Sequence, residues 1–283
     1  MRGAIIGDIV GSVYEWHNIK TKEFPLFSPD CFFTDDTVMT CAVAYAVQSA
    51  DRGGHLDDLD YFRNRGVEWM QFFGREYEGR GYGLRFLDWL YSDDPKPYGS
   101  TGNGSAMRVS PVAWVARTRQ ECIALATASA DVTHNDPEGI KGAVATALAV
   151  YLAKEGKSVQ QIRHCLTKNY YPELAGMTVD GIRPTYTFHG SCMRSVPQAI
   201  ACALEATSFE DAIRNAISIG GDSDTIAAIA GSIAEPLFGI PPDLWATCTD
   251  VMRRTGGEDL LEIDKDFSVY KRNYCHYLMW TRD

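Results

Sequence analysis

Two short segments of the chain place carboxylates and hydroxyls directly before an apolar, helix-like run. Residues 220–225 read Gly-Gly-Asp-Ser-Asp-Thr before the run 226–233, and residues 34–37 read Thr-Asp-Asp-Thr before the run 38–47. Ser, Thr and Asp are preferred helix caps and acids suit the first turn, so one such segment alone would indicate a cap. Doubled carboxylates in two segments exceed what caps require, because one side chain completes a cap.

The spacing within these segments bears on a metal site. Side chains two positions apart on a regular helix point about 200° away from each other. Asp222 and Asp224 can therefore converge only in an irregular first turn, which Gly220 and Gly221 allow. We expect this turn to face the one at 34–37, where carboxylates about 4 Å apart would repel by roughly 1 to 4 kcal/mol per pair. A cation removes this repulsion, and oxygen ligands favour Mg²⁺, Mn²⁺ or Ca²⁺ over zinc.

Other polar residues could bind a ligand or transfer protons, and each has a structural alternative. Glu15 fits a surface acid at a helix end, or a group that positions or deprotonates an attacking water. The glycine-rich stretch 98–107 fits a plain surface loop, or a loop that wraps a diphosphate or a sugar. Arg108 could meet a phosphate or form a structural ion pair. His134, at a helix entry, could be a cap-associated side chain, a ligand contact or a proton-transfer group.

Composition and charge exclude several classes of protein. The 283 residues are 45% hydrophobic and 23% charged, as in an ordinary soluble globular protein. The net charge of −10 argues against general binding to nucleic acids or acidic membranes. No apolar run is long enough to span a membrane, and the N-terminal apolar stretch is too short for a signal peptide. The eight cysteines form no CxxC pair, which favours reduced, inert thiols in a cytoplasmic protein.

Helical periodicity runs through most of the chain, and alternating strand-like patterns are nearly absent. We expect a buried helix at 3–16 with small residues four apart, which lets another backbone approach closely. Thr118 and Ser158 begin capping-box patterns, and Asp136 with Pro137 marks another helix start. Pro197 is expected at the first position of a helix in the same way. We therefore predict an all-α protein with residues 1–283 as a single domain.

Five motifs occur in the order found in the ADP-ribosylglycohydrolases, and the sequence resembles this family from residue 3 to about 240. The family includes relatives of dinitrogenase reductase-activating glycohydrolase and the ADP-ribosyl-acceptor hydrolases. The motifs are Gly7-Asp8-x-x-Gly11-x-x-x-Glu15, Thr34-Asp35-Asp36-Thr37, Gly102-Asn103-Gly104-Ser105-Ala106-Met107-Arg108, His134 and Gly221-Asp222-Ser223-Asp224-Thr225. The resemblance implies a compact orthogonal helical bundle with two Mg²⁺ ions, or Mn²⁺ in their place.

Site residues follow from the resemblance, motif by motif. The implied metal ligands are Thr34, Asp35, Asp36, Asp222, Asp224 and Thr225. Glu15 resembles the acidic residue that works beside the metals, and Asp36 is counted as catalytic with it. The residues that resemble the ligand-binding loop and its histidine are Gly99, Ser100, Gly102, Asn103 and His134. The pair Gly104-Ser105 departs mildly from the Gly-Gly common in this loop.

The implied enzyme hydrolyses the glycosidic bond between ADP-ribose and an acceptor, which is a protein side chain or a small conjugate, and releases ADP-ribose. In the expected mechanism the cations bind the distal ribose and a water, and Glu15 acts as base or orienting group. Two alternatives remain open: a two-metal nucleotide phosphoesterase, and a non-catalytic ADP-ribose-binding protein. Residues 10–17 resemble the serine-linkage branch more than the arginine-linkage branch, but they leave the scissile bond open.

Overall fold

The structure, a computed structural model, describes the backbone of residues 1–280 and the side chains of residues 1–271. These residues form helices joined by loops, with one isolated antiparallel bridge between Gly102 and Ser191, which confirms the predicted all-α class. The elements are α1 (Arg2–Gly11), α2 (Asp35–Arg52), α3 (Leu59–Glu76), α4 (Leu84–Leu90), α5 (Gly104–Met107), α6 (Ser110–Val115), α7 (Arg119–Asp131), α8 (Pro137–Lys154), α9 (Val159–Asn169), the 3₁₀ helix η1 (Pro172–Ala175), α10 (Val179–Ile182), α11 (Cys192–Glu205), α12 (Phe209–Ser218), α13 (Ser223–Phe238), α14 (Pro242–Arg254) and α15 (Glu258–Trp280).

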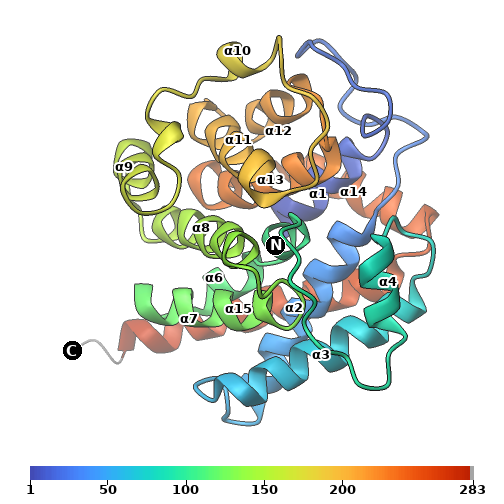
Figure 1. Cartoon of the computed structure of the whole chain (residues 1–283), viewed down its shortest axis with the longest axis vertical. Helices are drawn as coiled ribbons and strands as arrows, with labels where there is room; N and C mark the ends of the chain where they lie inside the picture. Colours follow the sequence, from blue (N-terminus) through green and yellow to red (C-terminus); the bar gives the residue numbers. More distant parts are fainter. Residues whose placement is uncertain (281–283) are drawn as a thin grey trace.

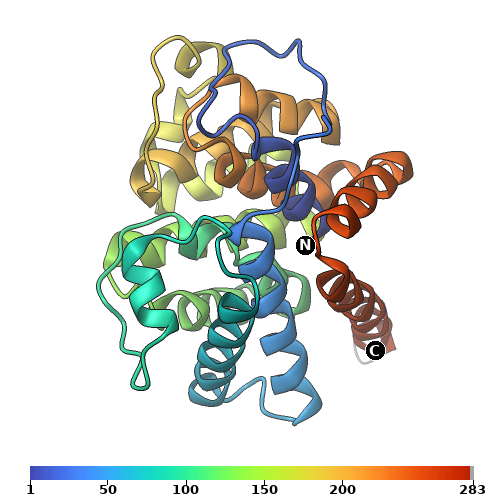
Figure 2. The same ribbon diagram turned by 90° about the vertical axis from the view of Figure 1, so that its right-hand side faces the viewer.

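Helix α13 lies at the centre of the packing. Helices α1, α8, α11 and α12 all contact it, while α2 packs against α3 and α15. Figure 1 shows α11, α12 and α13 together in the upper half of the molecule, with α2, α3 and α7 below them. Figure 2 shows the long blue connection between α1 and α2 reaching over the upper half. This arrangement brings the beginnings of α2 and α13 to the same region.

Glycines set how closely α1 approaches α13. Gly3, Gly7 and Gly11 face α13, as their four-residue spacing predicts. A Cβ at Gly7 would lie 2.0 Å from the carbonyl oxygen of Ala227, and one at Gly11 would lie 2.4 Å from the Cα of Asp224. No side chain fits at these contacts. The end of α1 is therefore held directly against the first turn of α13.

We expect Gly7→Ala to lower the free energy of unfolding by about 1–3 kcal/mol or more, because the added methyl forces two backbones apart. Urea denaturation measures the change. Gly176→Ala is the matched control, since Gly176 is exposed at φ −115° and a Cβ there meets nothing within 4 Å. The control should change stability by less than about 1 kcal/mol. Equal stability of the two variants would contradict the close packing of α1 on α13.

Two predicted helix boundaries were wrong. Helix α1 ends at Gly11 rather than at Trp16, so Glu15 lies in the connection that follows and not on a helix. Pro197 lies inside α11, which begins five residues earlier at Cys192. Cys192 and Val196 are both fully buried, so apolar packing continues the helix across the proline at the cost of one backbone hydrogen bond.

Most of the predicted helix starts are confirmed. Ser158 forms the complete capping box with Gln161 at the start of α9. Asp136 caps α8, with proline at its first position. Thr118 caps α7 by accepting from the amide of Glu121 at 3.1 Å, but the Glu121 carboxylate does not close the box. It binds the backbone and guanidinium of the residue before the cap instead.

The cysteines of the described side chains form no disulfides. Seven cysteines are unpaired thiols, and all but Cys165 are buried; Cys275 lies outside the residues whose side chains are described. No helix in the described part of the chain combines the length and the apolar character that crossing a bilayer requires. Burial makes the Cys122 thiol a poor nucleophile, because it raises the pKa of that thiol to about 12.

Candidate metal and ligand site

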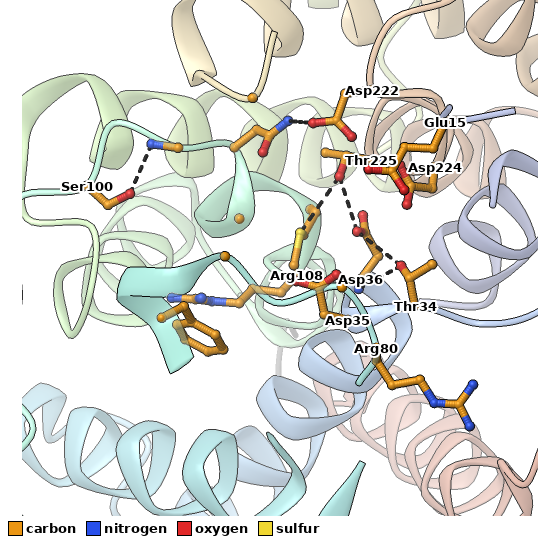
Figure 3. A pocket seen from close by; sticks show the side chains of 18 of the residues that line it. Glu15, Thr34, Asp35, Asp36, Arg80, Ser100, Arg108, Asp222, Asp224 and Thr225 are labelled. Carbon is orange, nitrogen blue, oxygen red and sulfur yellow. Dashed lines mark hydrogen bonds between the residues drawn. The ribbon is translucent and has the colours of Figure 1, made fainter. Parts of the chain in front are cut away.

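The first turns of α2 and α13 present their carboxylates to one acidic cluster (Figure 3). Thr225 Oγ1 donates to Asp36 Oδ2 at 3.1 Å, which links two segments 189 residues apart. Two groups of carboxylates, each with its oxygens within 4.8 Å of one another, share one member: Asp8, Asp36 and Asp224, and Glu15, Asp222 and Asp224. The two acidic segments thus meet in space.

The irregular start of α13 has the predicted cause. Gly220 and Gly221 adopt φ values of +69° and +84°, which other residues rarely adopt. Asp222 is the N-cap residue by position, but its side chain makes no capping hydrogen bond. Its Oδ2 instead accepts from Asn103 Nδ2 at 2.8 Å. The carboxylate of Asp222 therefore serves the cluster and not the helix end.

At the start of α2, Thr34 caps the helix, and the carboxylates of Asp35 and Asp36 are left for the acidic cluster and the cavity. Thr34 is the cap, because its Oγ1 accepts from the amide of Asp36 at 3.3 Å. Asp36 is 2% exposed, and its Oδ1 has no hydrogen-bond partner in the described structure. Asp35 lines the adjoining cavity. Capping therefore explains Thr34, but it does not explain the carboxylates of Asp35 and Asp36.

The cluster concentrates negative charge without a protein cation. Burial, and then the neighbouring carboxylates, raise the pKa of Asp36 and Asp224 well above the ordinary value. Burial, followed by the charges of Asp8 and Asp222, does the same to the pKa of Asp35. The ion pairs within residues 1–271 involve none of these three carboxylates. Closely spaced oxygen ligands without a counter-charge fit a hard divalent cation.

Asp8, itself a member of the acidic cluster, also organises the start of α2. Its Oδ1 accepts from Thr34 Oγ1 at 2.7 Å, and its Oδ2 accepts from the amides of Thr34 and Thr37 at 3.0 and 3.1 Å and from the Thr37 hydroxyl. Burial raises its pKa to about 6, while these hydrogen bonds oppose the rise. Asp8 belongs to the first of the five motifs, but this role was not predicted for it. The sequence did contain a signal for it, because a carboxylate within a buried, glycine-rich helix needs hydrogen-bond donors from a neighbouring segment.

Asp8→Asn should weaken the binding of a divalent cation to the acidic cluster about 10- to 100-fold. The amide offers one acceptor oxygen where four donors now converge, so the Thr34 turn must shift. Calorimetric titration with Mg²⁺ or Mn²⁺ tests this. Thr37→Val, which removes a single donor and keeps the side-chain shape, should have a smaller effect in the same direction. Wild-type cation affinity in Asp8→Asn would contradict the organising role.

Glu15 is held over the cluster by Asn18. Asn18 Nδ2 donates to the carbonyls of Tyr14, Glu15 and Gly221 at 2.7, 2.9 and 2.9 Å, and its Oδ1 accepts from the Gly221 amide at 2.7 Å. The side chain of Glu15 is half-buried, and burial, followed by the charge of Asp222, raises its pKa to about 7. Asn18 was missed in the sequence, because a single asparagine in a loop carries no motif.

A cavity of about 730 Å³ extends from the acidic cluster. Its lining includes Ser100, Gly102, Asn103 and His134 of the predicted ligand-binding set, together with the implied metal ligands and Glu15. Gly99 is not in the lining; its amide donates to Asn135 Oδ1 at 2.6 Å. This volume is in the usual range for a small-molecule site. Figure 3 shows Ser100 and Asp222 on opposite sides of the space.

His134 supports the glycine-rich segment. It is 4% exposed, and its Nδ1 lies 2.7 Å from Thr133 Oγ1. A Cβ at Gly102 or at Gly104 would lie 3.4 Å from its Nε2, so the loop backbone rests against the imidazole ring. Burial, followed by the charges of Arg108 and a second arginine, lowers the pKa of His134 well below the ordinary value. The imidazole is therefore neutral at physiological pH.

Two roles were considered for Arg108 from the sequence: the structural ion pair is not observed among the described side chains, and the phosphate contact stays a prediction. Arg108 is 1% exposed and lines the cavity, and it takes part in no ion pair among the described side chains. Its Nη2 donates to Ser129 O at 3.2 Å and to Thr133 Oγ1 at 2.7 Å, and its guanidinium lies 5.8 Å from the ring of Phe86. Arg108 thus ties the floor of the cavity to the end of α7.

Comparison with known proteins identifies the family of the chain. The family model described as ADP-ribosylglycohydrolase matches residues 1–274, so the chain belongs to the ADP-ribosylglycohydrolase family. This confirms both the family and the glycohydrolase enzyme class expected from the motifs.

Several relatives have names that state what they act on. The chain is 28% identical to the ADP-ribosylhydrolase ARH3 of Mus musculus, over 87% of this chain and 85% of that protein. The Homo sapiens ARH3 is also 28% identical, over 87% and 86%. The ADP-ribosylarginine hydrolase Tri1 of Pseudomonas putida (strain GB-1) is 25% identical, over 85% of this chain and 71% of that protein.

A solved structure shares the fold. A chain described as part of an ADP-ribosylglycohydrolase-related protein complex matches with a TM-score of 0.60, over 90% of this chain and 97% of its own length. At 22% sequence identity the match shows the fold alone. The predicted helical bundle of the ADP-ribosylglycohydrolase type is thereby confirmed.

Proposed function

We propose that this chain is a divalent-cation-dependent hydrolase that cleaves the bond between C1″ of ADP-ribose and an acceptor, and releases ADP-ribose. The observation that carries the proposal is an acidic cluster without a protein counter-charge at one end of a cavity of about 730 Å³. Membership of the ADP-ribosylglycohydrolase family supports it. Its partners would be ADP-ribosylated proteins or small ADP-ribosyl conjugates, and residues 1–283 would act as one cytoplasmic domain.

The metal ligands in this proposal are Thr34, Asp35, Asp36, Asp222, Asp224 and Thr225, with two Mg²⁺ ions, or Mn²⁺, as the cofactor. Two overlapping groups of carboxylates with a shared aspartate support two ions rather than one. Bound divalent cations lower the pKa of a water molecule and attract the oxygens of a sugar. The unpartnered, buried Oδ1 of Asp36 is a ligand atom available for that purpose.

Glu15 is proposed as the group that accepts a proton from the attacking water or orients it. One of its oxygens lies within 4.8 Å of oxygens of Asp222 and Asp224, so a water held there is within its reach. A general base works best when its pKa is near the working pH, and burial brings the pKa of Glu15 to about 7. Asn18 keeps the backbone of Glu15 in place while the side chain acts.

The opposite wall would hold the rest of the ADP-ribose. Ser100, Gly102 and Asn103, with the adjoining Gly99 as part of the same loop, are proposed to bind the diphosphate and a ribose, with the Ser100 and Asn103 side chains as the polar groups. His134 would contact the ligand as a neutral imidazole, which can donate from one ring nitrogen and accept at the other. The hydrogen bond from Asn103 to Asp222 joins the two walls.

The test is release of ADP-ribose from ADP-ribosylated protein, followed by chromatography with and without EDTA. We expect turnover in Mg²⁺ or Mn²⁺ and none in EDTA. Release of inorganic phosphate from ADP-ribose or nucleotides, without glycosidic cleavage, would favour a phosphoesterase. Binding of ADP-ribose without any turnover would favour a non-catalytic binding protein. Turnover that persists in EDTA would remove the metal from the mechanism.

A further inference from the structure

Large exposed hydrophobic side chains gather at the rim of the cavity. Of the nine such side chains among the described residues, four line it: Trp16, Phe32, Leu84 and Phe188. Trp16 is 74% exposed and Phe188 is 42% exposed. Their rings stack at a centroid distance of 5.3 Å and an interplanar angle of 17°. Because neither ring belongs to the core, burial does not explain why aromatic residues stand here.

The stacked pair lies at the acidic end of the cavity. Trp16 directly follows Glu15 in the chain. Phe188 lies two residues before Gly190, where a Cβ would stand 3.9 Å from Asp222 Oδ2. Ser100 and His134 also line this cavity. Because Trp16 adjoins Glu15, the proposed base, the two rings flank the place where the proposed reaction separates ADP-ribose from its acceptor.

The two chain segments that carry the rings both contact Gly221, through Asn18 and Tyr186. Asn18 binds the amide and the carbonyl of Gly221 and also the carbonyl of Glu15, so it fixes the backbone that carries Trp16. Tyr186 packs directly on Gly221, where a Cβ would lie 2.4 Å from Tyr186 Cε1, and its hydroxyl donates to Arg194 O at 2.7 Å. The pair is thus a positioned surface rather than two loose side chains.

We propose that Trp16 and Phe188 form an acceptor platform that selects a planar, cationic acceptor, the guanidinium group of an arginine side chain. A guanidinium stacks on an indole face, and Trp provides the strongest such contact. Glu15, which directly precedes Trp16 and also lines the cavity, adds a carboxylate next to this surface. Residues 10–17 as a whole resemble the serine-linkage branch, but a serine acceptor has neither a planar face nor a charge to use the surface that Trp16 and Phe188 form. A nucleobase acceptor would bring a polyanion to a chain of net charge −10.

This inference rests on the proposed function and refines its substrate. Hydrolysis breaks the C1″–N bond, and the water oxygen forms the new bond to C1″. One proton of the water stays on the resulting hydroxyl and the other passes to the departing nitrogen. The guanidinium is restored on the acceptor, so charge and atoms balance without a further reactant. The platform would hold the acceptor while this bond breaks.

The experiment compares two peptides of equal length, one carrying ADP-ribosylarginine and one carrying ADP-ribosylserine, assayed in Mg²⁺. We expect the wild-type chain to cleave the arginine conjugate. In Trp16→Ala, the ratio of kcat/KM for arginine over serine should fall about 5- to 30-fold, mainly through KM. Trp16→Phe should recover part of the loss, and Phe188→Ala should change the ratio in the same direction. Phe72→Ala, 53% exposed and outside the cavity lining, is the control and should leave the ratio unchanged.

The outcomes separate this inference from the function on which it rests. An unchanged ratio in Trp16→Ala, or an equal loss of kcat on both peptides, would overturn the acceptor platform. Cleavage of the serine conjugate alone by the wild-type chain would overturn it too, and would leave the glycohydrolase intact. Release of ADP-ribose from neither peptide would contradict the proposed function itself. Circular dichroism of each variant verifies folding, which is expected because both rings are exposed.

Discussion

Asp36→Asn should reduce ADP-ribose release by on the order of 10³-fold and leave the helical circular dichroism intact. The activity falls because the substitution removes a charged ligand from the acidic cluster. The fold survives because the amide oxygen can still accept from Thr225 Oγ1. The metal-free variant should also melt at the same or a higher temperature than the wild type at pH 8. The reason is that the substitution removes the unpartnered Oδ1 of Asp36 from the buried cluster. It also removes the charge repulsion between Asp36 and the carboxylates of Asp8 and Asp224.

Two further variants sharpen this result. Asp224→Asn should behave in the same way, because Asp224 belongs to both carboxylate groups of the cluster. Asp131→Asn is the control: it removes the ion pair with Arg63, whose Nη2 lies 2.8 Å from Asp131 Oδ2, far along the chain from either acidic segment. The control should keep full activity. Unfolding of both Asp36→Asn and Asp224→Asn would mean that these carboxylates serve the helix ends and not a metal.

Removing divalent cations should abolish turnover and make thermal stability strongly dependent on pH. Burial raises the pKa of Glu15 to about 7 and of Asp8 to about 6, and raises the pKa of Asp36 well above the ordinary value. A carboxyl group with a raised pKa in the folded state favours folding while it is protonated, and that contribution is lost as the pH rises through the folded pKa. The metal-free protein should therefore melt at lower temperature at pH 8 than at pH 5.

Added Mg²⁺ should reverse this loss most strongly at pH 8, where the cluster is most fully ionised. At 100 times the dissociation constant, one bound ion stabilises the folded state by about 2.7 kcal/mol, which corresponds to a rise in Tm of roughly 5–11 °C. Differential scanning fluorimetry in EDTA and in Mg²⁺ between pH 5 and 8 measures it. Asp36→Asn should show a much smaller response to Mg²⁺. A pH-independent Tm in EDTA would contradict the charge repulsion inferred for the cluster.

Local patterns in the sequence were sufficient to predict the helical class and most helix starts. Ser158 and Thr118 cap helices where their spacing indicates, because a cap depends only on residues within one turn. The glycines at 220 and 221 predicted an irregular turn before α13, since positive φ is an intrinsic preference of glycine. The motifs also predicted the family, which the comparison confirms.

Where local patterns and packing disagreed, packing decided. Apolar periodicity extended a predicted helix to Trp16, but α1 ends at Gly11, where close contact with α13 ends and the chain turns back over the cluster. Pro197 looked like a helix start, yet the burial of residues on both sides carries α11 through it. Local propensities are worth a few kcal/mol at most, and burial of a whole face exceeds them.

The sequence by itself determined which side chains could carry chemistry, because residue types and spacing are local properties. Only the tertiary structure decided which of them meet. The contact between Asp36 and Thr225, the clamp of Asn18 on Gly221 and the stacking of Trp16 on Phe188 each join residues more than 170 positions apart. Such contacts depend on how α1 and α2 pack against α13, and no pattern within one segment encodes that packing.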